Sequence, residues 1–205
     1  MVEAMLICIS REFGSGGHEI GKRLAKILGY SFYDRELVTE AVQRSNIPHE
    51  VLTNVDEKRE NPWLYSVVYD AVDQNLRGIS ASEAMFRIQS AVILEMAQQG
   101  SCIFVGRCAD DVLKKAGIDQ IISIFITAPF SDRVQRKMEL LGEEEKAATV
   151  LVRRMDKQRK SYYNYYTGKD WGKPYNYDLC SNSSPLGIEK TAEVLAALIE
   201  KMEKA

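Results

Sequence analysis

Short apolar runs alternate with segments of helical periodicity along most of the chain. Five apolar runs predict buried β-strands, at residues 5–9, 30–33, 101–105, 121–127 and 177–180. Apolar positions three or four residues apart predict helices around 20–28, 37–42, 80–99, 108–115, 132–141, 143–166 and 188–202. This alternation favours a three-layer α/β fold in which helices cover both faces of a parallel sheet.

A glycine-rich turn at residues 14–17 joins the first strand to the first helix. Strand, glycine loop and helix is the arrangement of phosphate cradles, because backbone N–H groups and the helix N-terminus face one concavity. The usual pattern, G-x-x-x-x-G-K-[ST], is altered. Arg11 stands at its first glycine, Gly17 at its lysine and His18 at its hydroxyl. The alternative is a glycine-rich turn that binds no ligand.

Polar and charged residues follow the predicted strands directly. Ligands of open α/β sheets bind outside the carboxyl ends of the strands. The residues at these ends are 11–17, Asp34, Arg35, Arg107, Thr127 and 182–185. Their convergence predicts one site at this edge of the sheet.

Composition excludes several classes of protein. The 205 residues suit one domain with an inserted lobe, and the net charge of −2 argues against broad binding of nucleic acid or anionic membranes. We expect no membrane span, because no 18-residue apolar run occurs, and no signal peptide, because the N-terminus enters a strand at once. Scattered cysteines predict reduced, mostly strand-buried thiols in a cytoplasmic protein; they are Cys8, Cys102, Cys108 and Cys180.

The order of motifs resembles the cytidylate kinase family, and the string S-R-E-F-G-S-G-G-H-E-I-G resembles its divergent cytidylate kinase-like branch. The resemblance also rests on Y-D-R after the second strand, G-R after the third and T-A-P-F-S-D-R-V-Q-R-K after the fourth. A D-x-x-R pair and L-G-I-E follow. The likeness spans nearly the whole chain and is weakest across 46–88, a segment with two prolines and a run of charges.

This resemblance implies a P-loop nucleotide kinase fold with a five-stranded parallel sheet in order 2-3-1-4-5. It implies a single domain over 1–205, containing a helical acceptor-binding lobe at 36–99 and a lid at 143–172. The implied reaction transfers the γ-phosphoryl group of ATP, with Mg²⁺, to a nucleoside monophosphate such as CMP or a related small acceptor.

The resemblance assigns roles to individual residues. Phosphate and ATP contacts are expected from Arg11, Gly14, Ser15, Gly16, Gly17, His18, Arg133, Arg136, Asn182 and Ser183. Catalysis is expected from Arg159, Arg107, Asp34 and Asp156, with Asp34 as the Mg²⁺ ligand. Acceptor binding is expected from Arg35, Arg107 and Arg153. Arg11 is our candidate for the charge of the missing lysine.

Simpler roles stand beside these. In one alternative, Arg11 forms an ion pair with Glu12. In another, Asp156 and Arg159 form an ion pair within one helix. The basic trio at 133, 136 and 137 is otherwise a solvated helix face. Seven aromatic residues in 162–177 are expected mostly to pack the lid against the core.

Cys108 stands where cytidylate kinases carry an aspartate that reads cytosine, which places cytosine specificity in question. Three functions therefore remain: a kinase for a CMP-like acceptor, a kinase for a non-nucleotide small molecule, and a non-catalytic nucleotide- or phosphate-binding regulatory module. We expect a monomer or homodimer that binds nucleotide and a small phosphorylated acceptor, without nucleic-acid or membrane partners.

Overall fold

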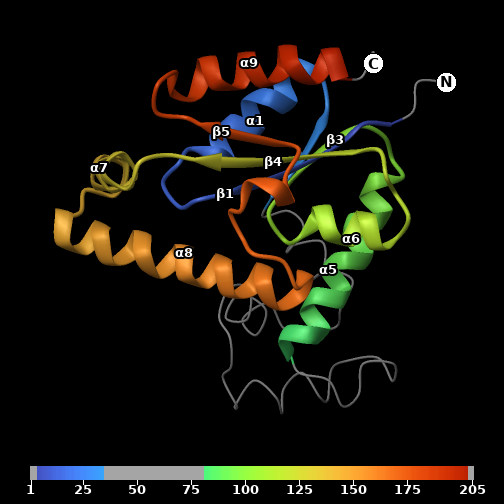
Figure 1. The fold of residues 1–205 in the computed structure, drawn as a ribbon, viewed down its shortest axis with the longest axis horizontal. Coiled ribbons are helices and arrows are strands. Elements are labelled where there is room, and N and C mark those ends of the chain that lie inside the picture. The colour runs from blue at the N-terminus through green and yellow to red at the C-terminus, as the bar shows by residue number, and fades with distance from the viewer. Residues whose placement is uncertain (1–3, 35–80, 203–205) are drawn as a thin grey trace.

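The computed structural model describes residues 4–34 and 81–202 (Figure 1). Its five strands are all parallel, in the order β2-β3-β1-β4-β5. They are β1 (Leu6–Arg11), β2 (Ser31–Tyr33), β3 (Cys102–Val105), β4 (Ile121–Thr127) and β5 (Leu179–Asn182). The predicted sheet order is thereby confirmed. Arg35 and residues 36–80 of the predicted acceptor lobe lie outside the described residues.

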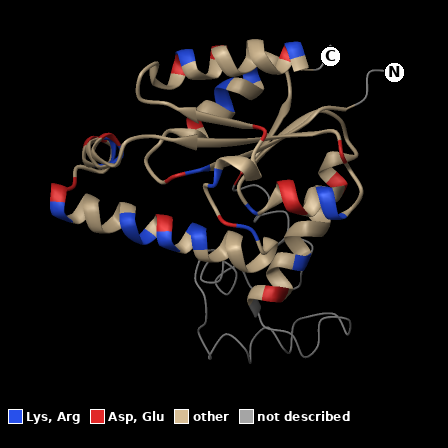
Figure 2. Cartoon of the chain, in the orientation of Figure 1, with Lys and Arg blue, Asp and Glu red and all other residues tan. Residues whose placement is uncertain are grey.

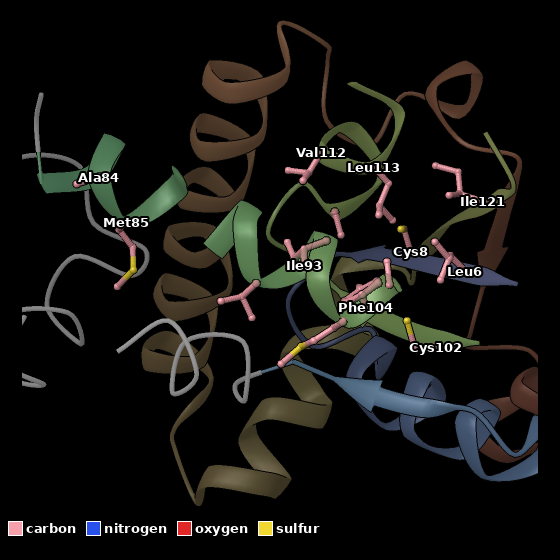
Figure 3. Close-up of a cluster of buried hydrophobic side chains, with 14 residues drawn as sticks. Leu6, Cys8, Ala84, Met85, Ile93, Cys102, Phe104, Val112, Leu113 and Ile121 are labelled. Carbon is pink, nitrogen blue, oxygen red and sulfur yellow. The ribbon is translucent and has the colours of Figure 1, made fainter. Parts of the chain in front are cut away.

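Helices cover both faces of the sheet (Figure 1), which confirms the three-layer arrangement. Helices α1 (Gly17–Leu28) and α9 (Gly187–Met202) lie on one face, and α5 (Ala81–Ala97) and α6 (Ala109–Lys115) on the other. Because side chains alternate along a strand, Ile7 and Ile9 pack toward α1 and α9. Leu6 and Cys8 pack toward α5 and α6 (Figure 3). Helix α5, included in the predicted lobe, thus belongs to this core.

Two further helices lie beside the carboxyl ends of the strands. They are α7 (Phe130–Leu141) and the long α8 (Glu145–Thr167). Helix α8, but not α7, lies within the predicted lid at residues 143–172. Val134 of α7 packs on Ala148 and Val152 of α8, and Phe13 of the glycine loop packs against this cluster. The loop and the two helices therefore share one small apolar core.

The aromatic end of α8 is anchored to the sheet. Tyr163 and Tyr177 are buried with Phe125 of β4, and Tyr166 stacks on Phe86 of α5 with ring centroids 3.9 Å apart. A 3-10 turn at Pro174–Asn176 precedes β5, so β5 begins two residues later than predicted. The prediction that most of these aromatic residues pack the lid segment against the core is confirmed.

Cys8, Cys102 and Cys108 are buried, whereas Cys180 is exposed. Its prediction as a buried strand residue is wrong, because β5 is the edge strand and its alternate residues face outward. Across residues 4–34 and 81–202, no helix has both the length and the apolar character needed to cross a membrane. The same residues contain no group of three or more His, Cys, Asp or Glu side chains arranged to hold a metal ion.

Candidate active site

The glycine loop adopts a backbone that only glycine tolerates well. Gly14 has φ +86° and Gly16 has φ +78°, in the left-handed region. A Cβ placed on Gly14 would lie 2.8 Å from the carbonyl oxygen of Arg133, so the first turn of α7 packs directly on the loop. The loop is therefore held in shape by α7 as well as by its own sequence.

The loop presents unused hydrogen-bond donors. The Ser15 N–H and hydroxyl both donate to the carbonyl oxygen of Glu12, at 3.3 and 2.9 Å. Within the described part of the chain, no acceptor takes the N–H groups of Gly14, Gly16 and Gly17. The first N–H groups of a helix lack intrahelical partners, and together with the helix dipole they favour an anion. The loop therefore offers a group of N–H donors at the start of α1, where an anion is favoured.

The tight packing of the loop gives a direct test. Gly142, which ends α7, shares the left-handed backbone of Gly14 at φ +67° but has open space around it. Gly14→Ala adds a clash to the backbone strain of about 1–2 kcal/mol that both positions share, and overpacking typically costs a further 1–3 kcal/mol. In urea denaturation, Gly14→Ala should therefore lose more stability than Gly142→Ala. Equal losses would contradict the close packing of α7 on the loop.

Arg11 fills the space that a lysine side chain at position 17 would need. A Cβ on Gly17 would lie 2.6 Å from Cβ of Arg11, and a Cβ on Gly106 would meet its guanidinium. The Arg11 guanidinium lies 3.5 Å from Asp34. Its predicted alternative partner, Glu12, instead accepts hydrogen bonds from Thr127 Oγ1 and the Ala128 N–H, so that alternative is wrong.

Asp34 is buried at the carboxyl end of β2 and joins two neighbours. Its carboxylate lies 2.5 Å from Nδ1 of His18 in the first turn of α1, and 3.5 Å from the Arg11 guanidinium. Mg²⁺ commonly takes only one or two protein carboxylates, its other ligands being waters and substrate phosphates. A single carboxylate beside the cradle therefore fits Mg²⁺ that arrives on a nucleotide, and does not form a metal cage by itself.

Arg133 and Asp156 form an ion pair beneath the loop. Arg133 is buried; it contacts Asp156 at 2.5 Å and donates to the carbonyl oxygens of Phe13 and Ala128 at 3.1 and 3.0 Å. Asp156 also accepts the Phe13 N–H at 2.8 Å. The interpretation of Arg133 as a solvated cation is wrong, because these groups hold the loop. Their geometry favours a positioning role over the predicted phosphate and catalytic contacts.

Three predicted arginines line one pocket at the carboxyl edge of the sheet. Arg11, Arg107 and Arg159 contribute to its wall, together with aromatic residues of the α8 end and the following turn. Arg159 donates to the carbonyl oxygen of Arg11 at 3.1 Å, and its guanidinium carbon lies 5.3 Å from the Phe13 ring centroid. Helix α8 therefore brings Arg159 to the residues that directly precede the glycine loop.

The turn that carries Arg107 is unusual in its backbone. Gly106, Arg107 and Cys108 have φ of +81°, +60° and +55°, although the last two have side chains that disfavour this region. Residues in such conformations typically cost 1–3 kcal/mol and cluster at functional sites. Cys108 is buried, and burial, with a contribution from Asp110, raises the pKa of its thiol. The strained turn directs residues of this segment to the pocket wall.

The carboxylates of Asp110 and Asp111, which follow Cys108 closely in the sequence, bond to other side chains of the protein. Asp110 accepts the Tyr163 hydroxyl at 2.9 Å, and Asp111 contacts Lys169 at 2.9 Å and Lys115 at 2.7 Å. Burial raises the pKa of Asp110. Both side chains are buried and tie α6 to the end of α8, so neither is placed to replace the missing aspartate at position 108.

The remaining predicted residues lie at varied distances from the pocket. Ser183 is buried and donates to the carbonyl oxygen of Ser15 at 2.7 Å, which ties the β5 loop to the cradle. Asn182 is exposed and accepts the Ser184 N–H. Arg153 is exposed with its guanidinium carbon 5.3 Å from the Phe130 ring centroid, and it does not line the pocket with the other arginines.

Arg136 lies beside the loop and contacts Glu19 of α1 at 2.9 Å. Although burial acts to raise the pKa of Glu19, its own backbone N–H and Arg136 lower that pKa below its usual value.

The sequence patterns did not single out Phe13, whose ring lies beneath Lys137 and Arg159. Its only local signal is an apolar residue inside an otherwise polar loop.

Comparison with known proteins identifies relatives of this arrangement. A model of the cytidylate kinase-like family matches residues 6–185. The cytidylate kinases of Methanococcus aeolicus and Methanocaldococcus jannaschii are 29% and 27% identical over 112 and 113 residues. Each match covers 54% of this chain and 62% of the relative, so the chain spans less than two thirds of these curated relatives.

Solved structures share the fold over nearly its whole length. An uncharacterized protein from Eubacterium ventriosum has a TM-score of 0.69 at 27% identity, covering 96% of this chain and 98% of the other. Shikimate kinase from Bacteroides thetaiotaomicron has a TM-score of 0.57 at 15% identity with the same coverage, which establishes a shared kinase fold alone. Because the family model matches residues 6–185, which is most of the chain, the protein belongs to the cytidylate kinase-like family.

Proposed function

We propose that the protein transfers the γ-phosphoryl group of ATP, bound with Mg²⁺, to a small phosphorylated acceptor, with CMP-like nucleoside monophosphates as first candidates. Family membership supports nucleotide-dependent phosphoryl transfer in general. The observation that carries the proposal is the set of open N–H groups at Gly14, Gly16 and Gly17, beside a pocket walled by three arginines. Phosphoryl transfer depends mainly on such positioning and charge neutralisation.

The residues divide between donor and acceptor. The cradle N–H groups hold the donor phosphates, and Arg11 supplies positive charge from the place of the absent lysine. Arg107 holds the acceptor phosphate, while Arg159 neutralises charge on the phosphoryl group as it moves. Asp34 would hold the Mg²⁺ that arrives with the nucleotide, and the ion would neutralise charge on the donor phosphates. The aromatic rings of Trp171 and Tyr162 lie in the pocket wall and offer flat surfaces on which a base can stack.

A non-nucleotide acceptor is the second candidate, and Cys108 is the observation in its favour. A buried thiol is a weak hydrogen-bond donor and acceptor, whereas tight discrimination between acceptors normally needs buried polar partners. The nearby carboxylates of Asp110 and Asp111 are engaged by other residues. A pocket of this kind also suits a sugar phosphate or a phosphorylated alcohol.

The experiment is a transfer assay with ATP and Mg²⁺ against CMP, dCMP, UMP, AMP, GMP, sugar phosphates and alcohols. Products are resolved by mass, beside a titration of nucleotide binding. Transfer to one acceptor would establish the kinase and name its substrate. Nucleotide binding without transfer would favour the regulatory module, and neither binding nor transfer would remove the proposal.

Arg11 and Gly17 offer a compensating pair of substitutions. We expect Arg11→Gly to lower kcat/KM about 100-fold, the usual scale for losing one charge-stabilising donor. Gly17→Lys alone should also fail, because Arg11 occupies the space that its side chain needs. The double variant, which restores the first glycine and the lysine of the usual pattern but keeps His18 at its hydroxyl position, should recover part of the activity.

The matched control is Lys22→Ala, which removes an exposed cation from α1, the helix that begins at Gly17. It should leave kcat/KM within about twofold, as surface substitutions usually do. Full activity of Arg11→Gly, or a double variant no better than Gly17→Lys, would contradict the role of Arg11.

A further inference from the structure

We propose that Lys137 of α7 is a donor-phosphate ligand, which holds the nucleotide's phosphates from the Phe13 side of the loop. The proposal rests on the function proposed above and adds to it a residue outside the glycine loop. It assigns the missing lysine charge to two places, with Arg11 on the pocket side and Lys137 on the α7 side.

The first observation is where the Lys137 ammonium lies. Its Nζ is 4.5 Å from the centroid of the Phe13 ring, and Phe13 directly precedes Gly14. The guanidinium carbon of Arg159 lies 5.3 Å from the same ring centroid. A cation over an aromatic face is attracted to it. Phe13 therefore gathers one cation from α7 and one from α8 beside the loop.

The second observation is the charge around Lys137. Within residues 4–34 and 81–202, no carboxylate forms an ion pair with its ammonium, whereas its neighbour Arg136 contacts Glu19 at 2.9 Å. The Lys137 side chain is partly buried, which lowers the pKa of its ammonium, and the positive charges of Arg136 and Arg159 lower that pKa further. The negative charge of Glu19 opposes this shift. Like charges held this close repel one another, and an anion among them relieves that repulsion.

The third observation connects these cations to the cradle. A Cβ on Gly16 would lie 3.9 Å from the guanidinium carbon of Arg136, one residue before Lys137. The cradle's open N–H groups and the α7 cations therefore lie within one small region at the start of α1. In the proposed binding mode, a polyphosphate contacts both the loop N–H groups and Lys137, and a single inorganic phosphate contacts fewer of these groups.

The experiment measures binding of inorganic tripolyphosphate to the purified protein by titration calorimetry, without Mg²⁺ or acceptor. Lys137→Met should weaken binding about 10- to 100-fold, the usual contribution of a hydrogen bond to a charged group. Lys137→Arg, which keeps the charge, should remain within a few-fold of the native protein. Lys26→Met, which removes an exposed lysine at the far end of α1, is the control for net charge and should change affinity less than about twofold.

Phe13→Leu separates a binding role from a purely structural one. If the ring positions the ammonium, Phe13→Leu weakens tripolyphosphate binding, and adding Lys137→Met produces less than the product of the two single effects. Thermal unfolding of each variant shows whether the fold is intact. Lys137→Met binding as tightly as Lys26→Met would overturn the proposal, and so would independent effects of the two substitutions.

The outcomes also distinguish this proposal from the proposed function. Lys137-dependent binding with no transfer to any acceptor would support the phosphate ligand and contradict the kinase. Transfer with no effect of Lys137→Met on tripolyphosphate or ATP binding would overturn only the ligand. A native protein that binds no tripolyphosphate would overturn the ligand, whereas the kinase would still be decided by the transfer assay.

Discussion

Replacing Arg159 with alanine is expected to lower kcat for phosphoryl transfer by about 1,000-fold, the lower end of the range for arginines that neutralise a moving phosphoryl group. Arg159 lines the same pocket as Arg11 and Arg107, and it donates to the carbonyl oxygen of Arg11 at 3.1 Å. That contact places its positive charge where donor and acceptor phosphates meet in the proposed reaction. The measurement is steady-state kinetics with the acceptor that the transfer assay identifies.

Two further variants make this result specific. Arg154→Ala removes an exposed arginine from the same helix, and its kcat should stay within about twofold of the native value. Arg159→Lys keeps the charge but loses the planar fork, so its kcat should fall between those of the native and alanine proteins. An Arg159→Ala protein that is folded and turns over at the native rate would remove Arg159 from the mechanism.

Replacing Arg133 with methionine is expected to produce a large loss of stability, about 3 kcal/mol or more. The substitution removes the buried partner of an ion pair with Asp156, whose side chain is 20% exposed, so we expect the lower end of the 3–5 kcal/mol that breaking a buried pair typically costs. It also leaves the carbonyl oxygens of Phe13 and Ala128 without a donor that they have in the native protein. Methionine retains much of the apolar packing volume, so the loss reports mainly on the polar contacts.

Urea denaturation measures this loss, with Arg154→Met as the exposed control, expected to change stability by less than about 0.5 kcal/mol. Asp156→Asn, alone and combined with Arg133→Met, completes a double-mutant cycle. A strong coupling is expected, because the two side chains contact each other at 2.5 Å and hold the same loop residue. Arg133→Met with near-native stability would show that the loop does not depend on this pair.

Much of the local structure was predictable because it follows from neighbouring residues. The predicted β4 at 121–127 has the observed bounds, because a short and mostly apolar run is typical of a strand buried on both faces of a parallel sheet. Gly29 ends α1 and Gly142 ends α7 in left-handed backbone, as glycines after an apolar periodic segment commonly do. The sheet order came from the family resemblance, because hydrophobic periodicity does not determine which strands pair.

The roles of the charged residues were harder to predict, because the same residue type occurs on solvated surfaces, in structural ion pairs and at ligand-binding sites. Arg133 is three residues from Arg136 on one helix face, yet it is buried while Arg136 is half exposed. Figure 2 shows that Lys and Arg also recur along α8, where Arg154 is exposed and Arg159 reaches the pocket. Helical spacing specifies the face of a helix, but only packing against the glycine loop determines which charges are buried.

By itself, the sequence determined the α/β class, the position of the glycine loop and the departure of that loop from the usual pattern. These features depend on local apolar periodicity and on residue identity. Only the tertiary structure decided why position 17 is glycine and which cations surround the loop. Arg11 fills the space beside Gly17, while Arg133, Lys137 and Arg159 approach the loop from α7 and α8. The contacts from α7 and α8 join Phe13 to residues more than 100 positions away in the sequence, and no local pattern encodes them.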